Sequence, residues 1–88
     1  MDSIAHTEKL FKNLDVEITA FIGALTHRNS ECEKHLGLMV VTAKEIGGKM
    51  YQDIEQLKRD YHQFLIKKVS LKKIQEDAIR IKHEVRPL

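Results

Sequence analysis

Apolar residues recur three and four positions apart along almost the whole chain, the spacing of an α-helix that buries one face. In the first third of the sequence four of them stand seven positions apart: Ile4, Phe11, Ile18 and Leu25. No alternation of apolar and polar residues persists as it does in a strand, and glycine and proline are scarce. The pattern predicts an all-α fold whose first helix covers about residues 3–27.

A short turn follows this first helix. Asn29 tolerates turn conformations, and Ser30 with Glu33 matches the capping box, in which two side chains satisfy free backbone N–H groups at a helix start. We therefore expect a turn at residues 28–30 and a second helix from about residue 31. Because the connection is short, the two helices are expected to form an antiparallel hairpin.

The second helix has its own apolar seam, with spacings that alternate between four and three. The seam comprises Leu36, Val40, Ala43, Gly47, Met50, Ile54, Leu57, Tyr61 and Phe64. Its phase is preserved across Gly47-Gly48, which favours one long helix over about residues 31–68. Each glycine inside a helix costs about 1 kcal/mol relative to alanine, so the alternatives are a kink at this pair or a break. In a break, Gly47 would cap one helix and another would start near Lys49.

A new apolar register begins after Ser70. It comprises Leu71, Ile74, Ala78, Ile81, Val85 and Leu88. Ser70 can cap a third helix over about residues 71–86, or the long helix can continue through a three-residue skip in its heptads. Lys68 and Gln75 stand where the earlier seam would need apolar residues. We interpret them as marking a turn; the alternative is a polar position that specifies coiled-coil register.

The predicted helices differ greatly in length. At 1.5 Å per residue, a helix over residues 3–27 spans about 37 Å and one over residues 31–68 about 57 Å. The first helix would therefore cover only part of the second. The sequence predicts a single helical domain over residues 1–88, built as a hairpin with a long second helix, as a coiled coil or a small three-helix bundle. The uncovered part needs a fold-back, a second copy or another protein.

The apolar residues beyond the reach of the first helix are the predicted partner-binding surface. They are Ile54, Leu57, Tyr61, Phe64, Leu71, Ile74, Ile81 and Val85. Their burial against a matching helix would stabilise a complex by about 25 cal/mol per Å² of apolar surface, before ordering costs. We therefore predict a non-enzymatic protein–protein interaction module, a small coiled-coil subunit or adaptor that forms an oligomer or a heterocomplex. The alternative within the binding class is a small helical chaperone for a secreted or filament-forming client.

Charge is distributed unevenly along the chain. Residues 1–57 contain six Lys and Arg against nine Asp and Glu, whereas residues 58–88 contain nine against four. A basic helix can bind nucleic acid or an acidic partner. On a helix, however, the cations of the second part scatter around the circumference, and no nucleic-acid-reading motif accompanies them. A basic helix that binds nucleic acid is therefore an alternative that we do not favour.

Candidate chemistry is sparse. Cys32 and His35 form C-x-x-H with His27 and Glu31 nearby, but a zinc site usually has two paired motifs. The sequence lacks the Glu-x-x-His of di-iron bundles, the H-E-x-x-H of metalloproteases and a glycine-rich phosphate loop. We therefore predict no catalytic residue, no metal and no cofactor.

Two further features bear on location. The single cysteine excludes an internal disulfide, and no apolar run approaches the ~18 residues of a membrane span. The first residues lack the basic and then apolar pattern of a signal peptide. We expect a cytoplasmic or other reducing intracellular compartment.

Overall fold

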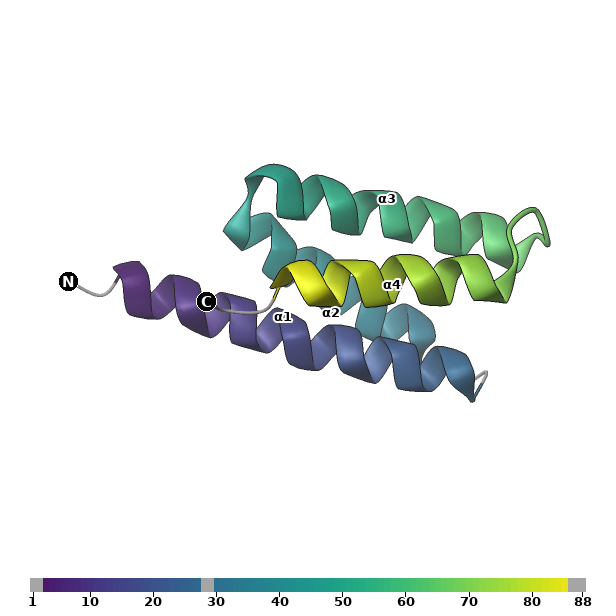
Figure 1. The fold of residues 1–88 in the computed structure, drawn as a ribbon, viewed down its shortest axis with the longest axis horizontal. Coiled ribbons are helices and arrows are strands. Elements are labelled where there is room, and N and C mark those ends of the chain that lie inside the picture. Colours follow the sequence, from purple (N-terminus) through teal and green to yellow (C-terminus); the bar gives the residue numbers. More distant parts are fainter. Residues whose placement is uncertain (1–2, 28–29, 86–88) are drawn as a thin grey trace.

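The computed structural model describes residues 3–27 and 30–85. Within them the chain forms four helices: α1 (Ser3–Thr26), α2 (Cys32–Ile46), α3 (Gly48–Leu65) and α4 (Leu71–Val85). Successive helices run antiparallel, and α1 and α3 each pack against both α2 and α4 (Figure 1). The prediction of an all-α fold is confirmed. The predicted hairpin with one long helix is replaced by a four-helix bundle.

The first hairpin agrees with the sequence pattern, apart from its cap. α1 ends at Thr26, and the backbone N–H of His27 closes it by donating to the Gly23 carbonyl. Most of the predicted turn, residues 28–29, lies outside the described residues. The N-cap of α2 is Glu31 and not Ser30, so the predicted capping-box register is wrong by one residue.

The prediction of a continuous helix over residues 31–68 is wrong, because the chain turns back at Gly47. Gly47 has φ 79° and ψ −171°, and Gly48 has φ 59°. Glycine adopts such angles readily, whereas a side chain makes them costly. The Gly47 N–H still donates to the Ala43 carbonyl at 2.8 Å, and α3 begins one residue later. The seam keeps its phase because α2 and α3 face the same core.

The connection from α3 to α4 is a second reversal, as the separate third-helix alternative predicted. The Lys68 N–H donates to the Gln63 carbonyl at 2.9 Å and the Lys67 N–H to the Phe64 carbonyl at 3.0 Å. This pair of bonds is the Schellman motif that closes many helices. Ser70 then caps α4, because its Oγ accepts from the Lys73 N–H at 3.2 Å. The interpretation of Lys68 as marking a turn is confirmed, whereas Gln75 lies within α4 and does not mark one.

The core runs between all four helices. Its largest fully buried side chains are Leu14, Ile18, Phe21, Leu25, Met39, Ile54, Leu57, Ile74, Ile81 and Val85. Phe21 of α1 meets Tyr61 of α3 edge to face, with ring centroids 5.8 Å apart and planes at 71°. This contact joins the two helices that lie diagonally across the bundle.

The residues predicted to bind a partner lie in or against this core. Six are buried: Ile54, Leu57, Tyr61, Ile74, Ile81 and Val85. The other two, Phe64 and Leu71, are half-buried against it. They are covered because α4 folds back onto α1 and supplies the neighbour that a long second helix would have lacked. In this fold they stabilise the chain itself and do not form an open surface.

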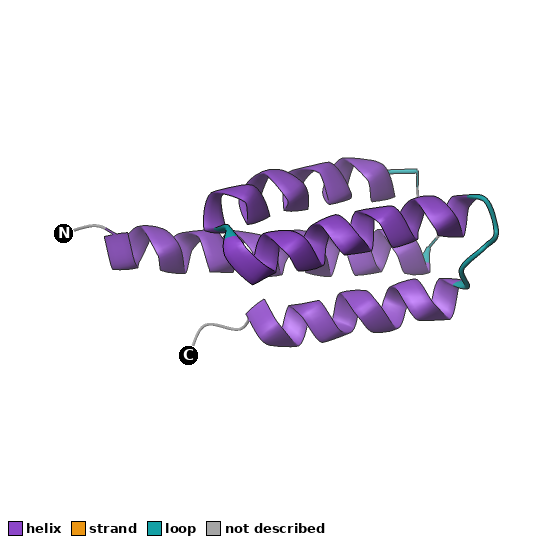
Figure 2. Ribbon diagram, turned by 90° about the horizontal axis from the view of Figure 1, so that it is seen from above, coloured by secondary structure: helices purple, strands orange, loops and turns teal. Residues whose placement is uncertain are grey.

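α1 is longer than its neighbours. It has 24 residues against 15, 18 and 15 for the other helices. Its first turns therefore extend past the bundle (Figure 2), and residues 5–9 are exposed. This overhang makes the two ends of the molecule different.

A half-buried carboxylate, that of Glu17, joins α1 to α2. Thr42 Oγ1 donates to Glu17 Oε1 at 2.9 Å, and the other oxygen, Oε2, is buried without a hydrogen-bond partner in the described residues. Burial raises the pKa of the Glu17 carboxyl, and the Thr42 hydrogen bond opposes that shift only in part. Ionised Glu17 is therefore held less favourably in the folded chain than in the unfolded chain.

The substitution Glu17→Gln is expected to preserve or increase the free energy of unfolding at pH 7. Because the folded pKa is raised, the penalty is absent below the unfolded pKa and grows as pH rises through the folded pKa. Urea unfolding from pH 4 to pH 8 should show wild type losing stability relative to the variant as pH rises. A relative gain by wild type over that range would contradict the assignment.

Candidate functional site

A largely apolar hollow lies where α1 and α3 end and α2 begins. This end pocket has a volume of about 460 Å³ and is lined by Leu25, Ser30, Cys32, Tyr61, Phe64, Leu65 and Lys67. Most of these positions continue the apolar faces of their helices to the helix ends. At the ends no further turn of a neighbouring helix covers them, and so a hollow remains.

The interior of the end pocket is uncharged at neutral pH, and Lys67 places a cation at its rim. Cys32 is 3% exposed, and its sulfur accepts a hydrogen bond from the Tyr61 hydroxyl. Burial raises the pKa of the Cys32 thiol, and burial with the nearby Cys32 and Glu33 charges raises the pKa of Tyr61 to about 12. Since the thiolate is the reactive form of cysteine, Cys32 is a poor nucleophile here. The interior suits apolar contact better than covalent chemistry.

Two neighbouring apolar side chains protrude beside this pocket. Leu65 is 50% exposed and Ile66 is 59% exposed, at the last residue of α3 and its C-cap. We call these two residues the apolar tip. Large apolar side chains that project together into water mark interaction sites more often than isolated ones do.

The tip is followed by two lysines. Lys67 has φ 62°, at the position of the Schellman motif that glycine usually occupies. Neither the Lys67 nor the Lys68 ammonium has a hydrogen-bond or ion-pair partner within residues 3–27 and 30–85. By contrast, the next lysines are paired along α4: Lys72 with Glu76 at 3.9 Å and Lys73 with Asp77 at 3.2 Å. Two cations next to the apolar tip are therefore free to meet a partner.

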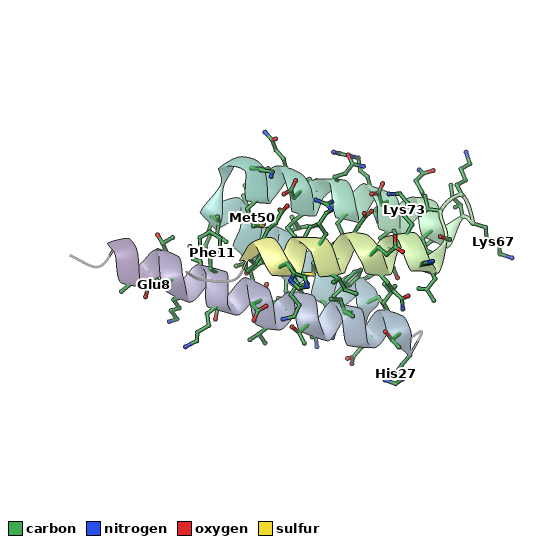
Figure 3. All side chains as sticks on the ribbon, viewed as in Figure 1. Glu8, Phe11, His27, Met50, Lys67 and Lys73 are labelled. Atoms are coloured by element: carbon green, nitrogen blue, oxygen red, sulfur yellow. The ribbon has the colours of Figure 1, made fainter. Side chains whose placement is uncertain are left out.

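A second hollow lies at the opposite end, beneath the α1 overhang. This corner pocket has a volume of about 470 Å³ and is lined by Phe11, Ile46, Gly47, Lys49, Met50, Asp53 and Glu84. Figure 3 shows Phe11 and Met50 close together at this end and Lys67 at the other. The corner pocket combines an apolar floor with acidic groups.

The acidic groups of the corner pocket differ in how well they are paired. Glu84 Oε1 lies 3.9 Å from Lys49 Nζ and 3.6 Å from Arg80 Nη1. Asp53 Oδ2 is buried and has no hydrogen-bond partner in the described part of the chain. A buried carboxylate oxygen without a donor is costly, and a cation brought to it would remove that cost.

Among the candidate ligands considered from the sequence, His35 Nε2 lies 3.8 Å from Glu31 Oε2. Across the described ranges no three His, Cys, Asp or Glu side chains are placed to hold a metal ion. Likewise, none of the helices described has the length and apolar character to cross a membrane.

Sequence reasoning identified only part of these sites. Tyr61 and Phe64, predicted for a partner, do line the end pocket, although Tyr61 is also core. The apolar tip was missed, although Leu65-Ile66 lies off the seam directly before two lysines, which was the available signal. The corner pocket has no local signal, since its lining comes from all four helices and the α2–α3 turn.

Comparisons with protein-family models, with curated proteins and with solved structures each gave no match.

Proposed function

We propose that this chain is a non-enzymatic protein–protein interaction module, a small helical subunit of a larger assembly. The observation that carries the proposal is the apolar tip, in which Leu65 and Ile66 stand half or more exposed beside an apolar pocket. Burying such side chains against a partner contributes about 25 cal/mol per Å² of apolar surface. The partner contacts this end of the bundle and not the predicted seam, which the chain buries itself.

Two local features favour binding over catalysis at this end. The titratable groups inside the pocket, Cys32 and Tyr61, are both held neutral by their raised pKa values. The cation at the rim, Lys67, has a backbone angle that costs an L residue free energy, a cost that glycine would avoid. Strained residues cluster where a side chain is needed for recognition, and the Lys67 ammonium is unpaired.

The proposal can be tested by site-specific photo-crosslinking in cells that express the chain. A photoreactive residue at position 66 is expected to give a discrete crosslinked product, which the substitution Leu65→Asp abolishes. The matched control is position 79, because Ile79 is also an exposed isoleucine, at 44%, but lies on α4 away from the tip. An equal product from both positions, or a product insensitive to Leu65→Asp, would contradict the proposal.

A further inference from the structure

We infer that the partner of the apolar tip is a second copy of this chain, whose corner pocket receives it head to tail. The inference rests on the proposed function, because it names the partner of the same site. In this arrangement Leu65 and Ile66 of one copy contact the pocket that Phe11 and Met50 line in the next.

The two surfaces cannot meet within one copy. The bundle is 47 Å long and about 20 Å across, and the tip and the corner pocket lie at its opposite ends (Figure 3). Each copy therefore offers one projecting surface and one receiving surface, and none of residues 3–27 and 30–85 of its own chain occupies either of them. This is the requirement for a heterologous contact, in which different patches of identical subunits meet.

The two surfaces match in size and in apolar character. The apolar floor of the corner pocket is formed by three half-buried side chains: Phe11, Ile46 and Met50. Its volume of about 470 Å³ equals that of about 16 water molecules, at roughly 30 Å³ each. That space accommodates the two aliphatic side chains of the tip. The α1 overhang beside it provides a wall against which the docked end can lie.

The two surfaces also complement each other in charge. Of the charged residues that line the corner pocket, Asp53 and Glu84 are acidic and Lys49 is basic. Lys49 and Arg80 already contact Glu84, whereas Asp53 Oδ2 has no hydrogen-bond donor in the described structure. The tip brings two unpaired lysines next to its apolar residues. A docked Lys67 ammonium would lie near the carboxylates of Asp53 and Glu84.

A heterologous contact of this kind does not close on itself unless its rotation forms a ring. Each added copy leaves one free tip and one free pocket, so the assembly is expected to lengthen as concentration rises. The charge pairing predicts that association weakens at high salt, because salt screens exposed charges.

The test uses two variants that block opposite ends. Ile66→Asp places a carboxylate on the tip and leaves the pocket intact. Met50→Lys keeps a long side chain but places an ammonium beside Asp53. This ammonium pairs with the Asp53 carboxylate and repels the Lys67 ammonium of the next copy. Ile79→Asp is the matched control for a surface Ile→Asp change, and circular dichroism checks that every variant stays helical.

Light scattering over a concentration series distinguishes the outcomes. Wild type and Ile79→Asp should grow beyond the mass of a dimer, whereas Ile66→Asp and Met50→Lys should each remain monomeric. An equimolar mixture of the two blocked variants should form a dimer and stop, because one intact tip meets one intact pocket. Blocked variants that still assemble alone, or a mixture that stays monomeric, would overturn the inference.

A wild type that stays monomeric at every concentration would also overturn the inference. The proposed function is then tested separately, by the crosslink at position 66. A crosslinked product whose mass indicates a different protein, and which Leu65→Asp abolishes, would support the interaction module and reject self-assembly. Absence of any product at position 66 rejects both.

Discussion

Replacing both Gly47 and Gly48 with alanine is expected to convert the bundle into an exchanged dimer. In such a dimer α2 and α3 join into one straight helix, and the α3–α4 pair of each copy packs on the α1–α2 pair of the other. The core contacts are retained, but those between α2 and α3 and between α1 and α4 become intermolecular.

The physical reason is that alanine penalises the turn and favours the helix at the same two positions. At φ 79° and 59°, each side chain adds strain of about 1–3 kcal/mol. In a helix, each alanine is favoured over glycine by about 1 kcal/mol. The apolar seam stays in phase through this point, so a straight helix still presents one continuous apolar face. A chain that can no longer turn recovers its core from a second copy.

The measurement is the mass in solution of Gly47→Ala/Gly48→Ala in the Ile66→Asp background, which removes head-to-tail association. The matched control is Gly37→Ala in the same background. Gly37 lies within α2, and a Cβ there meets no atom within 4 Å. The control should stay monomeric and gain up to about 1 kcal/mol of stability. A double variant with the mass and stability of its parent would show that the turn does not depend on glycine.

Phe21→Ala is expected to lower the free energy of unfolding by about 3–5 kcal/mol, the usual range for removing a fully buried aromatic ring. Phe21 is 0% exposed and contacts Tyr61 edge to face, which links α1 to α3 across the core. Domains of this size have a total stability of roughly 5–15 kcal/mol. The loss is therefore a large part of the whole, and the melting temperature should fall by about 4–8 °C for each kcal/mol.

Val16→Ala is the matched control for this prediction. Val16 lies on the same helix but is 65% exposed, so its truncation should change stability by no more than about 0.5 kcal/mol. Urea unfolding followed by circular dichroism measures both variants. Equal losses in the two variants would mean that the aromatic contact does not stabilise the bundle.

The sequence by itself determined that the chain is helical and which face of each helical stretch is apolar. α1 covers Ser3–Thr26 where residues 3–27 were predicted, and Ser70 caps α4 as expected. Seam residues such as Leu36, Ile54 and Ile81 are buried. These properties follow from local rules, since a repeat near 3.6 residues fixes which side of a helix is apolar. Capping depends on residues within one turn of the cap.

Only the tertiary structure decided which neighbour each face meets. A seam keeps its phase whether the chain continues straight or reverses at Gly47, so periodicity could not separate a long helix from two short ones. The return of α4 to α1 converted the predicted partner surface into core. That return also left Leu65, Ile66 and the corner pocket uncovered. Exposure is set by contacts between residues distant in sequence, and a pattern read along one helix does not contain them.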